Sequence, residues 1–294
     1  MKFAAIDIGS NAVRLLFQNV YVQDGKPVFH KDSIFRVPLR LGEEAFLNGL
    51  FTPDKVDDLV KTMTAFRLLI DVHRPLNFRA CATSAMREAS NGPDAVERIR
   101  KEAGLDIEII SGHHEAQIIL ATHIERKLPL PGRDQLYIDV GGGSTELTVF
   151  RKGELADSKS FKIGTLRLRD RLVPPIRWDE MRDWVSSRCS NNNKLTAVGS
   201  GGNINKLVKM YGRATRPFLA SSVLSEAYQT LKAMPLKQRI VDLGLRPDRA
   251  DVIVPAARIF KRVLSWAGCK EICAPRFGLA DGIIRELYQK HVTD

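Results

Sequence analysis

Two stretches of the chain share one pattern of apolar and polar positions. The pattern occurs in AAIDIGSNAVRLL (residues 4–16) and in LYIDVGGGSTELTVF (residues 136–150). In each, a short apolar run leads into a turn of small residues, and apolar positions resume after it. This order predicts a buried β-strand, a tight turn and a second β-strand. The first strand carries an aspartate at its carboxyl end, Asp7 or Asp139.

Helical periodicity is clearest after Thr52 and Pro53, a pair typical of a helix start. Apolar residues follow at helical spacing as far as position 73, namely Val56, Leu59, Val60, Met63, Phe66 and Ile70. The pattern also predicts strands at 78–83, 106–110 and 195–198, and helices at 93–103, after the Ser111-Gly112 turn, at 250–266 and at 279–291. Strands that alternate with amphipathic helices indicate an α/β fold.

The distance between the two strand–turn–strand patterns indicates a duplication. Asp139 follows Asp7 by 139 − 7 = 132 residues, which fits a repeated domain better than a short solenoid repeat. A chain of 294 residues also reaches the size at which two domains become the expectation. The expected junction is the polar segment 127–135, which contains two prolines and a glycine. We therefore expect domains at 1–126 and 127–282, and the terminal helix, 283–294, is a candidate to complete the first.

Composition limits the class of protein. Hydrophobic residues make up 44% of the chain, and no apolar run approaches the roughly 18 residues of a membrane span. The four cysteines are too scattered for a disulfide framework or a zinc site, so we expect reduced thiols and a cytoplasmic protein. A net charge of +11 favours an anionic partner. The charge by itself does not choose between nucleic acid, a membrane surface and a polyanionic substrate; the motifs described below lead us to expect a polyanionic substrate, and neither nucleic acid nor a membrane.

Part of the positive charge lies in a basic strip at residues 159–177, which contains a single acid, Asp170. Such a run is either a solvated surface or a guide for a polyanion, and the sequence leaves both open. The strip consists of Lys159, Lys162, Arg167, Arg169, Arg171 and Arg177.

The turn after each aspartate suits a phosphate chain. Backbone N–H groups and hydroxyls in a turn of small residues form a concave surface of donors, and an aspartate at its mouth can hold a divalent cation. Two such turns predict two loops that act on one substrate. A third Gly/Ser turn, at 199–202, contains Gly201.

The segment 79–91 allows two interpretations. Cys81 and Arg87 have the spacing by which cysteine phosphatases place a thiolate against an arginine that binds phosphate. However, the loop lacks glycine, and Glu88 beside it opposes thiolate formation. A buried structural Cys81 is the favoured interpretation. Arg87, with Ser84 nearby, is a candidate phosphate ligand in either case.

Glu115 falls in the first turn of the helix expected after 112. The helix N-terminus favours its ionised form, which suits a general base that takes a proton from water. The alternative is a plain capping glutamate that answers Ser111. His113 and His114 are adjacent on this helix and point in different directions, so we expect no metal site there.

Six segments in order carry a resemblance to one family. They are IDIGSN (6–11), ATSAMREASN (82–91), ISGHHEA (110–116), DVGGGSTEL (139–147), AVGSGGNINKL (197–207) and RFGLADGII (276–284). With these motifs the chain resembles the exopolyphosphatase and guanosine pentaphosphate phosphohydrolase (Ppx/GppA) family of the actin-like ATPase superfamily. It is similar to the short two-domain members.

The resemblance implies two actin-like, ribonuclease H-like α/β domains that flank a cleft, and a homodimer. It implies a hydrolase that releases terminal phosphate from inorganic polyphosphate or guanosine pentaphosphate by metal-assisted attack of water. Glu115 would be the catalytic base, and Asp139 and Glu146 would lie at the attacking water and at the metal, Mg²⁺ or another divalent cation. The phosphate loops would be lined by Asp7, Ser10, Asn11, Ser84 and Arg87, and by Gly141, Gly142, Gly143, Ser144, Thr145 and Gly201.

The chain departs from the family pattern at two positions. His114 stands where the family often has an acid, and Ala280 stands where it usually has an arginine. Two alternatives therefore remain: a receptor that binds polyphosphate or guanosine polyphosphates without hydrolysis, and a kinase of the same superfamily. Phosphate release would separate an enzyme from a receptor, and sugars with labelled ATP would reveal a kinase.

Overall fold

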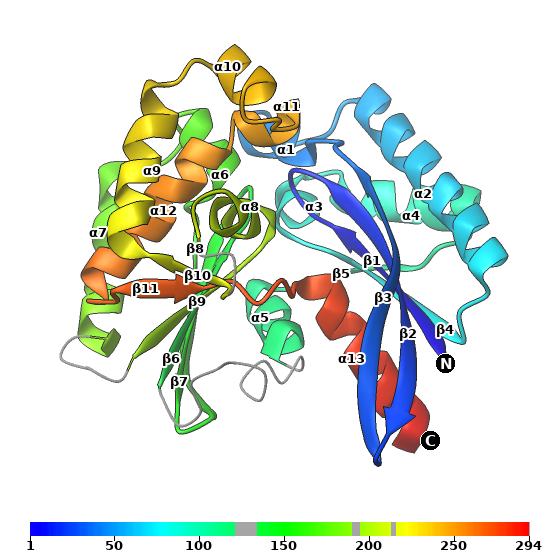
Figure 1. Cartoon of the computed structure of the whole chain (residues 1–294). Helices are drawn as coiled ribbons and strands as arrows, with labels where there is room; N and C mark the ends of the chain where they lie inside the picture. Colours follow the sequence, from blue (N-terminus) through cyan, green and yellow to red (C-terminus); the bar gives the residue numbers. More distant parts are fainter. Residues whose placement is uncertain (121–133, 190–194, 213–215, 294) are drawn as a thin grey trace. The chain divides into compact units, whose positions relative to one another are not determined.

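The computed structural model describes residues 1–120, 134–189, 195–212 and 216–293 (Figure 1). The chain forms two compact units. Unit 1 consists of Met1–Thr122 and Gly278–Asp294, and unit 2 consists of His123–Phe277. Most of the expected junction, 127–135, lies outside the described residues. Unit 1 is therefore discontinuous in sequence, because its last helix follows unit 2.

Unit 1 contains a five-stranded sheet in the order β3-β2-β1-β4-β5. Three strands, β1 (Lys2–Ile8), β2 (Val13–Gln23) and β3 (Lys26–Val37), pair antiparallel. The other two, β4 (Asn77–Ala82) and β5 (Ile107–Ile109), extend the sheet parallel to β1. Because β1, β4 and β5 are parallel, the loops that follow them meet at one edge of the sheet.

Helices cover both faces of this sheet (Figure 1). The face to which Ala4, Ile6 and Ile8 of β1 contribute packs against α1 (Leu41–Leu47), α2 (Pro53–His73), α3 (Ser84–Glu88) and α4 (Gly92–Ala103). The face with Phe3 and Ala5 packs against α5 (Gly112–Leu120) and α13 (Leu279–Thr293). Since successive strand residues point to opposite faces, Asp7 belongs to the side of α5 and α13.

Unit 2 contains a six-stranded sheet in the order β10-β11-β9-β6-β7-β8. In it β6 (Gln135–Val140), β7 (Thr145–Arg151) and β8 (Glu154–Phe161) pair antiparallel. Two strands, β9 (Thr196–Ser200) and β11 (Glu271–Cys273), run parallel to β6, and β10 (Phe218–Ala220) is an antiparallel edge strand. From β8 to β11 this sheet has three strands that pair antiparallel, followed by two that run parallel to β6. The sheet of unit 1 has the same order from β3 to β5, as a duplication predicts.

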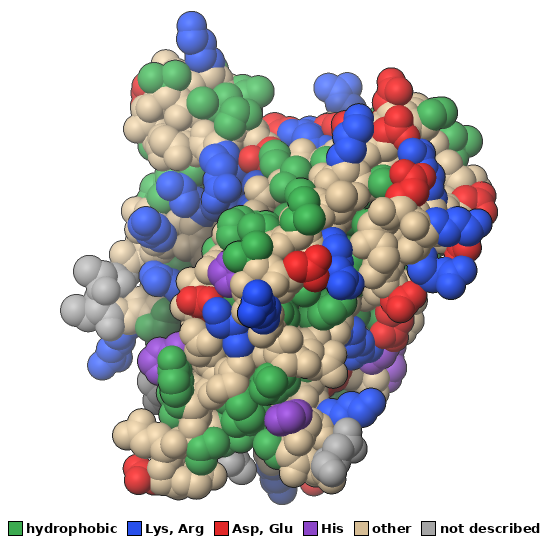
Figure 2. Space-filling model, turned by 90° about the vertical axis from the view of Figure 1, so that its right-hand side faces the viewer, with side chains coloured by type: hydrophobic (Ala, Val, Ile, Leu, Met, Phe, Trp, Pro, Cys, Tyr) green, Lys and Arg blue, Asp and Glu red, His purple; other side chains and the backbone are tan. Residues whose placement is uncertain are grey.

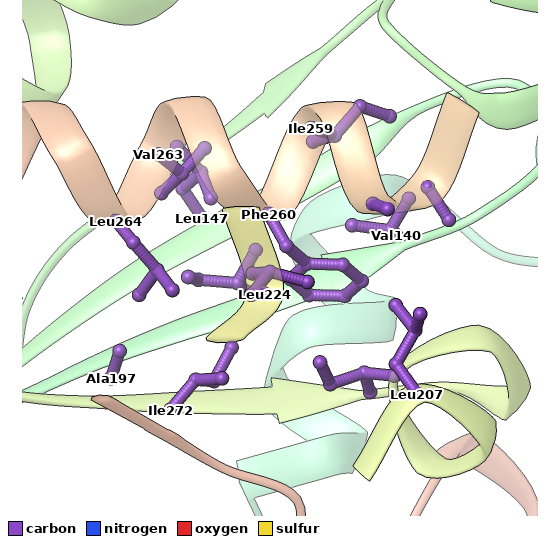
Figure 3. Close-up of a cluster of buried hydrophobic side chains, with 14 of the residues drawn as sticks. Val140, Leu147, Ala197, Leu207, Leu224, Ile259, Phe260, Val263, Leu264 and Ile272 are labelled. Atoms are coloured by element: carbon purple, nitrogen blue, oxygen red, sulfur yellow. The ribbon is translucent and has the colours of Figure 1, made fainter. Parts of the chain in front are cut away.

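The core of unit 2 forms around α12 (Ile253–Trp266) (Figure 3). Phe260 of this helix lies among Leu224 of α9 (Ser221–Ala233) and Leu207 of α8 (Gly202–Tyr211) (Figure 3). Other helices of the unit are α6 (Thr165–Arg169), α7 (Pro175–Cys189), α10 (Leu236–Val241) and α11 (Pro247–Ala250). The α/β class predicted from the sequence is confirmed in both units.

Most of the predicted elements form close to their expected bounds. Thr52 caps α2, since its side chain accepts a hydrogen bond from the backbone N–H of Lys55. The helix predicted at 250–266 is instead divided, and α12 begins only at Ile253. Pro255 explains this start, because proline is tolerated in the first turn of a helix but clashes in its interior. No described helix is long and apolar enough to cross a membrane.

Candidate active site

The loops after β1, β4 and β5 are joined at the carboxyl edge of the unit 1 sheet. Ser10 Oγ and Ser84 Oγ, both buried, lie 2.8 Å apart and share a hydrogen bond. The backbone N–H of Thr83 donates to the carbonyl of Ile8 at 3.1 Å, and that of Ile110 donates to the carbonyl of Ala82 at 3.0 Å. The structure thus brings together residues from motifs that lie 74 positions apart in the sequence.

Arg87 connects the second of these loops to the third. Its Nη1 donates to the carbonyl of Ile110 at 2.6 Å. Within the described residues the guanidinium has no further partner, so its remaining N–H groups are available to an anion. Arg87 can therefore hold a phosphate and the start of α5 together.

Glu115 lies in the first turn of α5, half-buried. The cap of this helix is Ser111, whose Oγ accepts from the backbone N–H of His114 at 3.1 Å. The acid of a capping box stands at the third helical position, and here that position is His114. Glu115 follows one residue later, with its own N–H bonded to the Ser111 carbonyl at 2.9 Å. The capping role considered for Glu115 does not match this geometry.

Helix α13, which carries most of the last family motif (276–284), packs closely against α5. A Cβ on Gly282 of α13 would lie 2.1 Å from the carbonyl oxygen of Ile118, so only glycine allows the two helices to approach this closely. Ala280 is buried in the same apolar cluster as Ile118. Asp281 accepts hydrogen bonds from Gln18 Nε2 at 2.7 Å and from the backbone N–H of Gly278 at 3.0 Å. The motif therefore acts through packing in unit 1, and Ala280 is part of that packing.

In unit 2 the loop between β6 and β7 is held from one side by α6. The carbonyl of Gly141 accepts from the N–H of Thr165 at 3.0 Å, and the carbonyl of Gly142 accepts from that of Leu166 at 2.9 Å. The carbonyl of Gly143 accepts from Nε of Arg167 at 2.8 Å. Three successive carbonyls of the loop are thus turned toward α6.

A planar trans peptide points its N–H opposite to its carbonyl. The N–H groups of Gly142, Gly143 and Ser144 are therefore directed away from α6. None of the three donates a hydrogen bond within the described part of the chain, although all three residues are buried. Buried donors without a partner are costly, and consecutive ones form a nest for an anion. The three N–H groups can therefore donate to an anion.

The charge beside the loop differs between the two copies of the hairpin. Asp7 is opposite Arg14 across β1 and β2, and Arg14 Nη1 lies 2.7 Å from Asp7 Oδ2. In the second copy Asp139 is opposite Glu146. Residues directly opposite on an antiparallel pair project from the same face, so two carboxylates stand side by side there. The first aspartate thus faces an arginine, whereas the second faces another carboxylate.

Three further residues of unit 2 lie close to the loop 141–144 or to Asp139. Thr145 is fully buried and its hydroxyl donates to the carbonyl of Ile163, so this side chain supports the loop. Gly201 has φ +95°, and a Cβ there would lie 3.4 Å from Asp139 Oδ1. Ser200 was missed in the sequence, although its turn was noted. It pairs with Asp139 in the β6–β9 register, is 5% exposed, and its hydroxyl has no partner in the described residues.

Comparison with known proteins shows the family of the chain. A model of the Ppx/GppA phosphatase family matches residues 25–291. The chain belongs to the Ppx/GppA phosphatase family. The resemblance seen in the motifs is thereby confirmed.

Individual members of the Ppx/GppA family are distant in sequence and similar in fold. The chain is 25% identical to exopolyphosphatase 1 of Mycobacterium leprae, over 97% of this chain and 88% of that protein. A crystal structure of an exopolyphosphatase from Cytophaga hutchinsonii matches with a TM-score of 0.85 and 24% identity, over 99% of this chain and 98% of that one. The Aquifex aeolicus Ppx/GppA member matches with a TM-score of 0.76 and 25% identity, over 99% and 98%.

The donor set of this Ppx/GppA chain fits Mg²⁺. No group of three or more His, Cys, Asp or Glu side chains is placed for a metal in the portion that the structure describes. Mg²⁺ is nevertheless commonly bound by one or two carboxylates together with substrate phosphates and water. Asp139 and Glu146 supply such a pair, and Glu146 Oε1 also accepts from Ser160 Oγ at 2.8 Å. These are the residues that would hold the ion.

Cys81 is unsuited to be a nucleophile. It is fully buried, and burial raises the pKa of its thiol to about 12, with the nearby Arg79 offsetting only part of this effect. The structural interpretation of Cys81 therefore agrees with its surroundings, and the thiolate interpretation does not.

The basic strip predicted at 159–177 is not a continuous surface. Arg167 is only 9% exposed, Arg169 pairs with Asp170 and Asp251, and Arg177 pairs with Glu180. Independently of the strip, the face drawn in Figure 2 shows Lys and Arg side chains spread out with Asp and Glu among them. The count of charges in sequence overestimated the strip because burial and pairing are set by the fold.

Proposed function

We propose that the chain is a phosphohydrolase that releases the terminal phosphate of inorganic polyphosphate by attack of water. The observation that carries this proposal is the loop of Gly142, Gly143 and Ser144, whose N–H groups face away from α6 beside the carboxylate pair of Asp139 and Glu146. Such a site stabilises the charge of a phosphoryl group in transfer. The naming of several relatives as exopolyphosphatases supports polyphosphate as the substrate.

Each group has a defined task in this reaction. Glu115 accepts a proton from the attacking water, as a carboxylate at a helix N-terminus can at neutral pH. Arg87 and the hydroxyls of Ser10 and Ser84 donate to phosphate oxygens. In unit 2, the N–H groups of loop 141–144 would also donate to phosphate oxygens. Phosphoryl transfer requires chiefly alignment and charge stabilisation, and these residues provide both.

Asp139 and Glu146 would hold Mg²⁺. When bound, the ion neutralises phosphate charge and polarises the bond that breaks. In unit 1 the aspartate at the corresponding position, Asp7, is instead paired with Arg14.

The proposal extends to assembly and location. We infer a homodimer in the cytoplasm, on the strength of the family resemblance and of four buried free thiols. Sedimentation of the purified protein at several concentrations tests the dimer, and a single monomeric species would contradict it.

One experiment tests the proposed function directly. Phosphate release is measured on long polyphosphate, tripolyphosphate, guanosine pentaphosphate and ATP, with Mg²⁺ and with a chelator. We expect release from polyphosphate that depends on the metal and is lost in Asp139→Asn. Binding without release in the wild-type protein would identify a receptor. Transfer of labelled phosphate from ATP to a sugar would identify a kinase.

A further inference from the structure

Arg167 is an arginine that the protein has buried against its own phosphate loop. It lies in α6 with 9% of its surface exposed, and its Nε donates to the carbonyl of Gly143 at 2.8 Å. Burial of a guanidinium is costly unless its hydrogen bonds are satisfied. A contact of this kind with a loop carbonyl indicates that the orientation of that carbonyl matters.

The loop needs an external constraint because of its composition. Gly142 and Gly143 have no Cβ, so the peptide groups on either side of Gly143 can turn over at little cost. A peptide that turns over exchanges its N–H for its carbonyl. If the Gly143–Ser144 peptide turned over, an oxygen would face the phosphate in place of the Ser144 N–H. The bond from Arg167 selects the orientation that presents the donor.

The first copy of the hairpin provides an internal comparison. With an offset of 132 residues, Asn11 corresponds to Gly143, and Ser10 corresponds to Gly142. In unit 1 the carbonyl of Asn11 accepts from the backbone N–H of Arg40 at 3.1 Å, and that of Ser10 accepts from Gly42 at 2.8 Å. The same two carbonyls are therefore captured in both copies. In unit 2 a guanidinium replaces one main-chain donor.

The close approach of α6 to the loop depends on Gly164. A Cβ on Gly164 would lie 2.2 Å from the carbonyl oxygen of Gly142. Real Cβ contacts are not this short, so glycine is required for α6 to reach the loop. Gly164 and Arg167, three residues apart, thus both serve the contact between α6 and the loop.

We propose that Arg167 is a positioning residue that holds the Gly143–Ser144 peptide with its N–H toward the phosphate. This inference rests on the proposed function, because it assigns the partner of that N–H as a phosphate oxygen of the substrate. Nothing in it requires Arg167 to touch the substrate.

The test compares Arg167→Ala and Arg167→Met with Arg169→Ala. Arg169 is the matched control, since it lies on the same helix and is also hydrogen-bonded, but to Asp170 and Asp251. Steady-state kinetics are measured on tripolyphosphate, and circular dichroism gives the fold and the melting temperature. We expect both Arg167 variants to raise KM by roughly 10- to 100-fold, the scale of losing a charge-assisted hydrogen bond. Arg169→Ala should lower the melting temperature and leave KM unchanged.

A purely structural role gives a different result. Loss of folded enzyme lowers the apparent kcat and leaves KM as it was. Millimolar guanidinium should restore KM in part for Arg167→Ala, whose side-chain space is open, and not for Arg167→Met, whose side chain fills that space. A wild-type KM in either folded variant would overturn the proposal, and the methionine variant keeps the test valid if the alanine variant does not fold.

Binding separates the two proposals. Affinity for methylenediphosphonate is measured by calorimetry in the wild type and in Arg167→Met. If the wild type hydrolyses no substrate but binds this compound more tightly than Arg167→Met does, the proposed function fails and the role of Arg167 stands. If both proteins bind it equally, the role of Arg167 fails, whatever the wild type hydrolyses.

Discussion

Replacement of Cys81 separates the two ways in which this protein could cleave a phosphoanhydride. The thiol is fully buried in β4, and its pKa is raised to about 12 from the ordinary 9.0. At pH 7.5 a group of pKa 12 is ionised to about 3 parts in 10⁵, about a thousandfold less than an ordinary thiol of pKa 9. A cysteine that acts as a nucleophile must be largely in its thiolate form at neutral pH. We therefore expect Cys81→Ser and Cys81→Ala to keep phosphate release within about twofold of the wild type.

The stability of these variants should change even where their activity does not. A serine hydroxyl in an apolar cluster, or the cavity left by alanine, costs about 1–3 kcal/mol of unfolding free energy. Urea unfolding measures this cost, and assays well below the transition keep it apart from activity. Iodoacetamide should label Cys81 only after unfolding.

Two results would refute the reasoning about Cys81. One is a Cys81→Ser protein that is folded and stable but inactive on every substrate. The other is wild-type activity that rises tenfold with each pH unit between about 8 and 11, as the thiolate fraction would.

Four further outcomes are expected. Glu115→Gln should lower kcat by roughly 10²–10⁴-fold, the contribution of a positioned base, and change the unfolding free energy by at most about 1 kcal/mol; near-normal turnover would return Glu115 to a structural role. Asp139→Asn should lose metal affinity together with activity, which calorimetric titration with Mg²⁺ would show, and unchanged affinity would move the ion elsewhere. Ser200→Ala should keep or increase stability, because the hydroxyl has no partner to lose, while KM rises; an unchanged KM would exclude a contact with substrate. Burial raises the pKa of Cys273 to about 12, as it raises those of the other three thiols, so the unfolded chain loses these protons first; the contribution of Cys273 to the unfolding free energy should be full below pH 9 and fall by roughly 1 kcal/mol between pH 9 and 10, and Cys273→Ala should therefore show a smaller fall in urea midpoints than the wild type.

The sequence predicted the parts of the fold that depend on local pattern. The structure confirms the two predicted hairpins, α2 with its Thr52 cap, and α4. Strand alternation, helical spacing and caps are properties of neighbouring residues, so a local pattern is enough to predict them. The candidate site residues were proposed from the same short motifs, and their roles stay predictions. Ser200 was not predicted, because the sequence around a serine in a glycine-rich turn does not show which groups its hydroxyl will face.

The roles that depend on distant partners could not be predicted. Arg14 and Glu146 hold corresponding places in the repeat, yet their meaning appears only when the strand register sets each beside an aspartate. Arg167 seemed to be one charge of a surface strip, and only the fold places it beneath Gly143. Pairing of strands and burial of charge are decided by the whole chain, and no window of sequence contains them.

Because α13 belongs to unit 1, the two units depend differently on the C-terminal segment of the chain. Unit 2, at His123–Phe277, is one unbroken segment that can mature as soon as it leaves the ribosome. Unit 1 cannot, because Phe3, Leu16 and Ile118 form their apolar cluster with Ile283 and Ile284 of α13. A chain truncated after Phe277 would therefore keep every segment of unit 2 and lack the helix that completes the apolar cluster of unit 1.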